Sequence, residues 1–454
     1  MASIQKRKNS FVVIYRYTND NGESKQKWEA FDTLKKARAR KAEIENKIEI
    51  GTFIAPSVQN VREFLESFIE LYGLKEWSLS TYARNKRLIN NYINPILGDL
   101  KIQEVNALTI EKYYHQLLRT PSTGNKIFKE SKNISAGTVN QIHRLLKCAF
   151  GVAETWDLVG VNVIKKVKPP KHVYAKRDIW NSNMIIEALD ACEDPKLAVA
   201  IHLAFACSLR LGEVLGLQWK NVHITDEEIA NEDAHINVEC QLESVSAEAL
   251  EALGEKGVIE VLPSRSTRGN KLKWVLKKPK TETSIRKIWL PNTLAYLLRE
   301  WKEEQKKYQE FFQDEYYDFG LVVCYEDGWY CSHNVIRHGL NHLIEKTGLP
   351  PIVFHSLRHT STTYKLKLNH GDIKATQGDT GHAQADMVTE VYSHILDEDR
   401  KLNAKKFDET FYTQSGNGMK DQENKTVEVD VDKLVSTLQK NPELMNQLVE
   451  ALKK

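Results

Sequence analysis

Three side chains that could exchange protons or attack an electrophile lie in one short segment, GHAQADMVTEVYSH. They are His382, Tyr392 and His394. A tyrosine phenol has an unperturbed pKa of about 10, so it is a weak nucleophile at neutral pH. A tyrosine at helical spacing usually packs in a core or at its rim. A chemical role for Tyr392 therefore requires cationic partners from distant parts of the chain.

Two further segments offer a guanidinium in a helical context. In FACSLRLGEVLGLQW, Arg210 follows an apolar run, and Glu213 lies three residues later on the same helical side. In FHSLRHTSTTYKLKL, the three-residue spacing of His355 and Arg358 predicts that both face the same way. Each motif alone is also compatible with a surface charge or salt bridge of little consequence. Together they could present two planar guanidiniums and an imidazole to one anion.

The segment VLKKPKTETSIRKIWLP adds an ammonium. Two strand-like runs flank a polar PKTET turn, so we expect a β-hairpin with Lys280 at or near its tip. An ammonium at such a tip could reach into a neighbouring cleft. Lys277 and Lys278 directly precede the turn and stay alternatives for the same role.

A phosphate is the anion that suits this set of cations. Arg210 and Arg358 could each hold its non-bridging oxygens bidentately, which a lysine could not do in the same geometry. Hydrogen bonds to charged groups contribute roughly 1.5 to 3 kcal/mol each. Such a cluster would neutralise a phosphodiester and stabilise the negative charge that develops when a phenolate attacks it.

In chain order, the motifs LRLGE, PKTETSIR, HSLRHT, TGH and VYSH resemble the signature of the tyrosine recombinases, the phage-integrase family. The resemblance covers approximately residues 175–410. It implies a catalytic set that consists of Arg210, Lys280, His355, Arg358, His382 and Tyr392.

The resemblance also implies a role for each residue. Tyr392 would attack a scissile DNA phosphorus and form a 3′-phosphotyrosyl link, while Lys280 would protonate the leaving 5′-oxygen. His355 would assist proton transfer and His382 would hydrogen-bond the phosphate, whereas His394 has no assigned step. A second strand's 5′-hydroxyl would then restore the phosphodiester, so no metal, cofactor or ATP is expected. The sequence contains no P-loop motif, which agrees with this expectation.

The implied function is the integration and excision of a mobile element of a temperate phage or a conjugative transposon. The implied partners are double-stranded DNA attachment sites of core and arm type, and a homo-tetramer on synapsed DNA. An excisionase and a DNA-bending host factor would be accessory partners.

The elements before this set predict two smaller domains. Residues 1–55 show two strand-like runs around an Asn-Gly turn, then a helix that Asp32 or Thr33 could cap. We expect an α+β unit that binds arm-type DNA sites. Residues 60–168 show four or five amphipathic helices, which predict an all-α domain that binds core-type sites. Candidate phosphate contacts in the two domains are Arg16, Lys25, Lys27, Arg84, Lys86, Arg87 and Lys147.

The rest of the chain predicts a mainly helical catalytic domain and a tail. The expected domain covers residues 175–412 and includes a β-rich interruption at about 235–291. Its segment 223–275 is longer than the connection that the family usually has there. Residues 413–454 predict a helical tail that could pack within its own protomer or on a neighbour. The expected fold class is therefore multidomain and mainly α, with a small β-sheet or hairpin in the catalytic domain.

Composition sets limits on location and partners. The net charge of +3 is nearly balanced, so any DNA affinity must come from local basic patches. Six cysteines without a C-x-x-C pair argue against a disulfide framework or a zinc site. No apolar run approaches the roughly 18 to 20 residues of a membrane span, and no signal region follows the basic N-terminus. We therefore expect no membrane partner and a location at the nucleoid in the bacterial cytoplasm.

Three alternatives stay open on the residues alone. A chromosome-dimer or plasmid resolvase of the same family would share the catalytic set but would not need the basic unit at residues 1–55. A type IB topoisomerase-like enzyme would relax DNA without a second DNA site. A DNA-binding regulator could keep the fold without catalysis, but it would have little reason to keep Tyr392 together with both arginines.

Overall fold

The computed structural model describes residues 2–18, 23–51, 53–56, 58–123, 133–172, 179–265, 271–279, 284–369, 372–374 and 376. All of them belong to one compact unit, Met1–Val388. Lys280, His382, Tyr392 and the predicted tail lie outside the described residues. No described helix is long and apolar enough to cross a bilayer.

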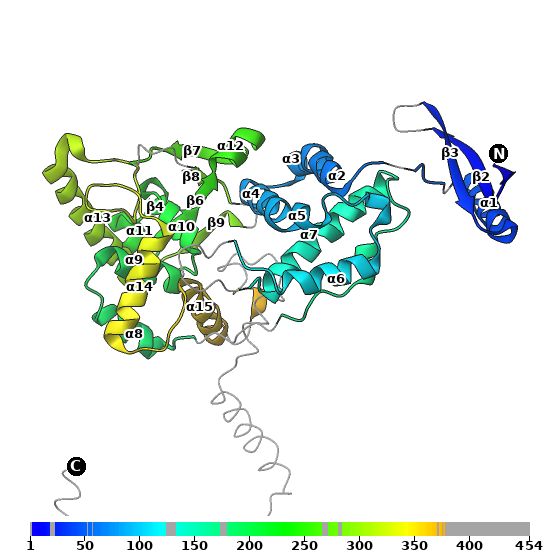
Figure 1. The fold of residues 1–454 in the computed structure, drawn as a ribbon. Helices are drawn as coiled ribbons and strands as arrows, with labels where there is room; N and C mark the ends of the chain where they lie inside the picture. The colour runs from blue at the N-terminus through cyan, green and yellow to red at the C-terminus, as the bar shows by residue number, and fades with distance from the viewer. Residues whose placement is uncertain are drawn as a thin grey trace, which may run out of the picture. The chain divides into compact units, whose positions relative to one another are not determined.

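The N-terminal segment forms a three-stranded antiparallel sheet with one helix on it (Figure 1). Its elements are β1 (Ser3–Arg7), β2 (Ser10–Thr18), β3 (Ser24–Phe31) and α1 (Leu34–Glu49). The Thr33 side chain accepts a hydrogen bond from the Lys36 N–H at 3.4 Å and so caps α1, as the sequence predicts. Val13 and Tyr15 of β2 pack against Ala37 and Ile44 of α1, which gives this segment a small core of its own.

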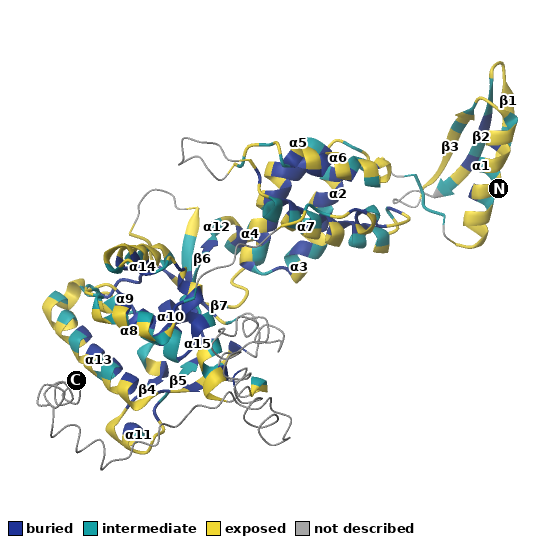
Figure 2. Cartoon of the chain, turned by 90° about the horizontal axis from the view of Figure 1, so that it is seen from below, coloured by how far each residue is buried: buried dark blue, intermediate teal, exposed yellow. Residues whose placement is uncertain are grey.

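The next segment is a helical bundle. Its helices are α2 (Val61–Phe68), α3 (Leu74–Glu76), α4 (Leu79–Leu88), α5 (Asn94–Leu97), α6 (Ala107–Leu117) and α7 (Ala136–Thr155), with π-helical turns at Ile69–Gly73 and Ile89–Ile93 and 3₁₀ turns at Ile102–Glu104 and Val163–Lys166. A capping box between Asn60 and Glu63 begins α2. The buried sides of these helices form one apolar core, shown in dark blue in Figure 2. The amphipathic spacing of the sequence predicts this arrangement.

The third segment surrounds two small sheets with helices. Its helices are α8 (Ser182–Asp190), α9 (Pro195–Ala206), α10 (Leu211–Gly216), α11 (Asp226–Ala230), α12 (Ala247–Leu253), α13 (Asn292–Phe312), α14 (His333–Thr347) and α15 (Phe354–Leu368), with 3₁₀ turns at Trp219–Asn221 and Gln313–Glu315. Its strands are β4 (Val222–His223), β5 (His235–Val238), β6 (Gln241–Ser246), β7 (Val258–Leu262), β8 (Leu272–Lys277) and β9 (Arg286–Trp289). The chain is thus mainly helical with small sheets, which confirms the predicted fold class.

The predicted hairpin around Lys280 is wrong. The strands before and after this turn, β8 and β9, belong to different sheets, with strand orders β6-β8-β7 and β4-β5-β9. The reason is the long segment 223–275, because it supplies β6 and β7 as antiparallel partners on both sides of β8. With both edges of β8 occupied, β9 pairs with β5 instead.

The same segment also packs against the helical bundle. Val245, Ala249 and Val275 are buried in the core of the bundle rather than in the core of the third segment. The Lys86 ammonium of α4 lies 2.5 Å from a Glu248 carboxylate oxygen of α12. Segment 223–275 therefore joins the two parts through apolar contacts and an ion pair.

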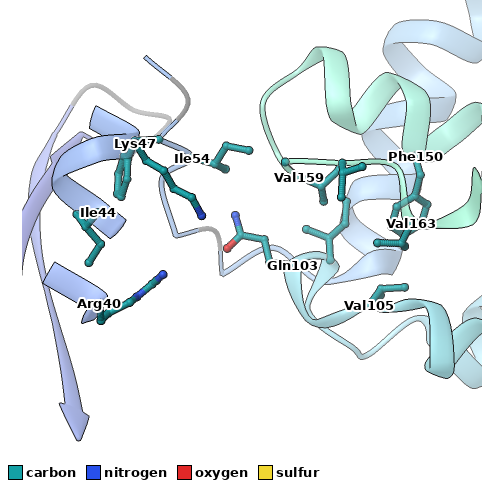
Figure 3. Close-up of a pocket in the computed structure, with 13 residues that line it drawn as sticks. Arg40, Ile44, Lys47, Ile54, Gln103, Val105, Phe150, Val159 and Val163 are labelled. Carbon is teal, nitrogen blue, oxygen red and sulfur yellow. The ribbon is translucent and has the colours of Figure 1, made fainter. Parts of the chain in front are cut away.

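A cavity of about 510 Å³ lies where the first segment meets the bundle (Figure 3). From α1, Arg40, Ile44 and Lys47 face it, and Val159 and Gln103 are among the residues on the other side. The Gln103 side-chain amide donates hydrogen bonds to the Ala55 carbonyl at 2.9 Å and to the Leu158 carbonyl at 3.1 Å. Of the candidate catalytic residues that the structure describes, Arg210, His355 and Arg358, none lines this cavity.

Candidate functional site

The corner between α9 and α10 presents Arg210. Ser208 has a φ of 54°, in the left-handed region, and this turns the chain sharply after α9. Ser208 is buried, and its hydroxyl shares a hydrogen bond of 2.6 Å with the hydroxyl of Ser361 on α15. The turn thus places Arg210 at the N-cap of α10 and fixes its backbone against α15.

The carboxylate of Glu213 is the centre of an arginine cluster. It is 2% exposed, and its Oε1 accepts a hydrogen bond of 2.8 Å from Arg210 Nη1. Its Oε2 accepts the Arg210 backbone N–H at 2.9 Å and Arg286 Nη2 at 3.0 Å. Arg358 Nη1 lies 4.0 Å from the same oxygen. The predicted pairing of Arg210 with Glu213 is therefore present, and two more guanidiniums share this carboxylate.

Arg358 reaches the cluster from α15 and is 1% exposed. Its Nη1 donates a hydrogen bond to the Ser208 carbonyl. Burial, together with the positive charge of Arg210, lowers the pKa of the Arg358 guanidinium to about 9. This direction means that burial and the neighbouring guanidiniums outweigh the stabilising effect of Glu213 on the charged form. An anion bound beside it would relieve that cost.

The arginines of the cluster keep Glu213 ionised. Burial alone would raise the pKa of the Glu213 carboxyl, but Arg286 and Arg210 more than offset burial, and the pKa lies below its usual value. Glu213 is therefore ionised at neutral pH. Among the described residues, three guanidiniums gather around this one carboxylate, which is a suitable environment for a phosphodiester.

Arg210 opens into a basic cleft of about 720 Å³. Its wall carries two carboxylates, Glu76 and Glu243, and a larger number of cations: Arg84, Arg210, Lys256, Lys277 and Lys278. The Lys277 ammonium is buried in an ion pair with Glu243, which makes it less accessible than Lys278 as an alternative to Lys280. Lys278 is exposed, and Pro279 at the edge of the cleft directly precedes Lys280.

His355 lies at the rim of the cluster rather than in it. It is exposed, although the predicted shared side with Arg358 suggested similar surroundings for the two residues. The difference arises because α15 packs with the side that carries Leu357 and Arg358 toward the protein interior, whereas His355 remains at the surface. His355 lines a second cavity, of about 580 Å³, together with Arg337 and Gly212. Gly212 and His333 line both cavities, so the cavities of His355 and Arg210 adjoin at the start of α10.

Strand register separates the three basic candidates of the N-terminal sheet. Lys25 and Lys27 pair directly with Tyr17 and Tyr15, and directly opposed residues share a face of the sheet. They therefore lie on the face that α1 covers. Arg16 lies on the opposite face, because successive residues alternate. Only Arg16 of the three belongs to the face that no described helix covers.

The basic candidates of the helical bundle differ in their exposure and in their ion pairs. Arg84 and Arg87 are exposed and three residues apart on α4, so they face the same way. The hydrogen bond of Lys86 to Glu248 raises the pKa of the Lys86 ammonium and holds it against α12. Lys147 is exposed on α7. Arg84 is the one that lines the same cleft as Arg210.

Arg286 is the residue that the sequence-based prediction missed. It lies on β9 in RKIW, where Ile288 is buried and Lys287 and Trp289 are exposed. This alternation could have revealed it, because it places Arg286 on the same face as Ile288. A charged residue on a buried face requires a partner of opposite charge.

Two family models match the chain. The model of the phage integrase N-terminal SAM-like domain matches residues 60–118, which contain α2 to α6. The model of the phage integrase family matches residues 263–399, which contain Lys280, His355, Arg358, His382 and Tyr392.

The chain is similar to known recombinases over most of its length. It is 23% identical to a tyrosine recombinase XerC-like protein of Caldanaerobacter subterraneus subsp. tengcongensis, over 87% of this chain and 94% of that protein. It is 22% identical to the ICEBs1 integrase of Bacillus subtilis, over 72% of this chain and 77% of that protein. Its fold resembles the Tn1549 transposon integrase in complex with a circular intermediate DNA, with a TM-score of 0.55, 17% identity, and coverage of 77% of this chain and 99% of that chain. The chain therefore belongs to the tyrosine recombinase or phage integrase family and is a site-specific DNA recombinase.

Proposed function

We propose that this chain integrates and excises a mobile DNA element by cutting and rejoining DNA at attachment sites, with Tyr392 as the nucleophile. The observation that carries the proposal is the cluster in which the Arg210 and Arg358 guanidiniums lie beside the buried Glu213 carboxylate, with Arg210 on the wall of a basic cleft. Such a cluster is held in place before DNA arrives, so little reorganisation is needed when charge develops on the phosphate.

In the first step, the phenolic oxygen of Tyr392 forms a bond to the scissile phosphorus, and the bond from phosphorus to the 5′-oxygen breaks. The phenol passes its proton to the His355 imidazole, and the Lys280 ammonium donates a proton to the leaving 5′-oxygen. His382 donates a hydrogen bond to the phosphate. In the second step, a 5′-hydroxyl from another strand attacks the phosphotyrosine and releases Tyr392, so the number of phosphodiester bonds is unchanged.

Arg210 and Arg358 supply the electrostatic part of catalysis. The phosphate gains negative charge as the phenolate attacks, and two guanidiniums can donate hydrogen bonds to its non-bridging oxygens. Arg358 is buried, and an interaction between its guanidinium and a phosphate is stronger there than it would be in water. The proposed reaction needs no metal ion or ATP, because the phosphotyrosine preserves the bond energy.

Double-stranded DNA is the proposed substrate and partner. The basic cleft beside Arg210 and the exposed pair Arg84 and Arg87 would contact the phosphate backbone, as would Lys147. The structure of the Tn1549 integrase contains such a DNA, a circular intermediate. We extend the proposal to a homo-tetramer on two synapsed sites in the bacterial nucleoid, and to an excisionase and a DNA-bending host factor as accessory proteins.

In this proposal, residues 1–55 bind arm-type sites and residues 60–168 bind core-type sites. Residues 175–412 form the catalytic domain, and residues 413–454 form the tail. The uncovered face of the N-terminal sheet carries Arg16, and Arg7 lies 4.9 Å above the ring of Trp28 on the same face. This face combines cations with an exposed aromatic ring, which suits a nucleic acid. A separate DNA-binding unit of this kind favours an integrase over a resolvase.

The proposal predicts recombination on plasmids without metal or ATP. A supercoiled plasmid that carries both attachment sites should yield recombinant circles in the presence of EDTA and without nucleotide. The control is the same plasmid with one site scrambled, which should yield none. Relaxed circles without recombinants would favour the topoisomerase-like alternative, and DNA binding without any cut product would favour the regulator.

Deletion of residues 1–52 tests the N-terminal unit in the same assay. We expect the shortened chain to cut an isolated core site at the rate of the full chain, because the cluster around Glu213 is untouched. Integration that depends on distal arm sites should be lost. The core-site rate serves as the internal control for folding. An unchanged yield of integration would contradict the role given to this unit.

A further inference from the structure

We infer that Arg286 is a positioning residue for the DNA cleavage reaction, which acts through Glu213 to hold Arg210 and Arg358 ready for the scissile phosphate. The inference rests on the proposed function and adds a residue that lies outside the predicted catalytic set. The Arg286 side chain is 6% exposed. It belongs to β9, whereas the other members of the cluster belong to α10 and α15 or their ends.

The Arg286 guanidinium contacts the Glu213 carboxylate and the backbone carbonyl of Ser284, two residues earlier in the chain. Its Nη2 donates to Glu213 Oε2 at 3.0 Å, and its Nη1 lies 3.4 Å from Glu213 Oε1. Nη1 also donates to the Ser284 carbonyl at 3.0 Å. The guanidinium thus faces both oxygens of Glu213 from the side that Arg210 leaves open.

The charge of Arg286 decides what Glu213 does to the other two arginines. A carboxylate has about four lone-pair sites, and Arg286 occupies sites that Arg210 and Arg358 could otherwise reach. Without Arg286, the buried carboxylate would hold those two guanidiniums more strongly and would compete with the phosphate for them. It would also repel the phosphate directly. Arg286 removes both effects, although it does not itself need to touch DNA.

Arg286 also ties the cluster to the segment that carries Lys280. Ser284 is buried and is the first described residue after residues 280–283. Its carbonyl is held by the same guanidinium that holds Glu213. One side chain therefore joins Ser284, four residues after Lys280 in the sequence, to the carboxylate that orients Arg210. A change at position 286 should thus disturb cleavage more than DNA binding.

The test compares Arg286→Met, Arg286→Lys and the double variant Arg286→Met with Glu213→Gln. The measured quantity is the single-turnover rate of covalent complex formation on a nicked core-site duplex. We expect Arg286→Met to lower this rate about 100-fold, as a misplacement of about 1 Å can do. Arg286→Lys should stay within about tenfold of the unmodified chain, since it keeps the charge but loses the planar fork.

The double variant separates positioning from a merely structural role. Glu213→Gln removes the negative charge that Arg286 compensates, so the double variant should cut about tenfold faster than Arg286→Met alone. DNA affinity should stay within about threefold in all three, because most of it comes from other phosphate contacts. Arg40→Met is the control, because Arg40 also forms an ion pair with a glutamate, Glu29 at 2.8 Å, but lies away from the cluster and is more exposed than Arg286. It should cut the core site normally.

Each outcome has a definite meaning. A normal rate for a folded Arg286→Met chain, judged by its thermal unfolding, would overturn the inference. A double variant that is no faster than Arg286→Met would also overturn it, because the defect would then not pass through Glu213. If the unmodified chain forms no covalent complex, the proposed function fails, and the inference fails with it.

Discussion

The Tyr392→Phe chain is expected to bind its core site with normal affinity and to form no covalent complex at all. The substitution removes the single oxygen that attacks phosphorus and keeps the ring, so contacts with the DNA backbone are unaffected. No neighbouring group can replace a lost nucleophile within the same geometry. The measurement is a denaturing gel with a nicked suicide duplex, in which a covalent adduct migrates more slowly than free DNA.

The control for this prediction is the same substitution at another tyrosine, one that is exposed at the surface. Tyr364 is an exposed residue of α15, the helix that also carries Arg358, and it has no proposed role in catalysis. The control is therefore Tyr364→Phe. It should form the adduct at the normal rate. An adduct with the Tyr392→Phe chain would show that a different residue is the nucleophile, and the assignment of the family motif to position 392 would then be wrong.

The second large effect is expected for Arg210→Lys. Lysine keeps the charge but cannot hold Glu213 and two phosphate oxygens with one planar group. Removal of one preorganised donor of this kind lowers rates by about 100- to 1000-fold. We expect this loss in the single-turnover rate of cutting, with DNA affinity nearly unchanged, as measured on the same nicked duplex.

Arg299→Lys provides a matched control for Arg210→Lys. The Arg299 side chain is 38% exposed, close to the 35% of Arg210, and it also pairs with one carboxylate, that of Asp226. It lies on α13 and lines neither cavity of the candidate site. The control should cut at the normal rate. Equal rates for the two variants would mean that Arg210 contributes only charge, and the bidentate contact proposed for it would have to be abandoned.

Local sequence patterns predicted the parts of this molecule that depend on near neighbours. The cap at Thr33, the amphipathic helices of the bundle and the pairing of Arg210 with Glu213 all involve residues three or four positions apart. Such contacts are set by helix geometry, so their spacing is visible in the sequence. The motif set that indicates phosphate chemistry was visible for the same reason, because each motif is short.

Long-range pairing is where the sequence was insufficient. The two strands around Lys280 look like a hairpin, but β8 is captured by partners from segment 223–275, and nothing local encodes that choice. The role of Arg286 depends on a partner 73 positions away, so it could be suspected from the strand alternation but not assigned. The separation of Arg16 from Lys25 likewise follows from strand register.

The most direct test of the central claim is a structure of the Tyr392→Phe chain bound to an uncut core site. The account predicts that one DNA phosphate lies within hydrogen-bonding distance of both the Arg210 and Arg358 guanidiniums. The substituted ring at position 392, from the same or a neighbouring protomer, should face that phosphorus. A complex in which the DNA backbone avoids the two arginines, or in which position 392 lies far from the phosphate they hold in every protomer, would contradict it.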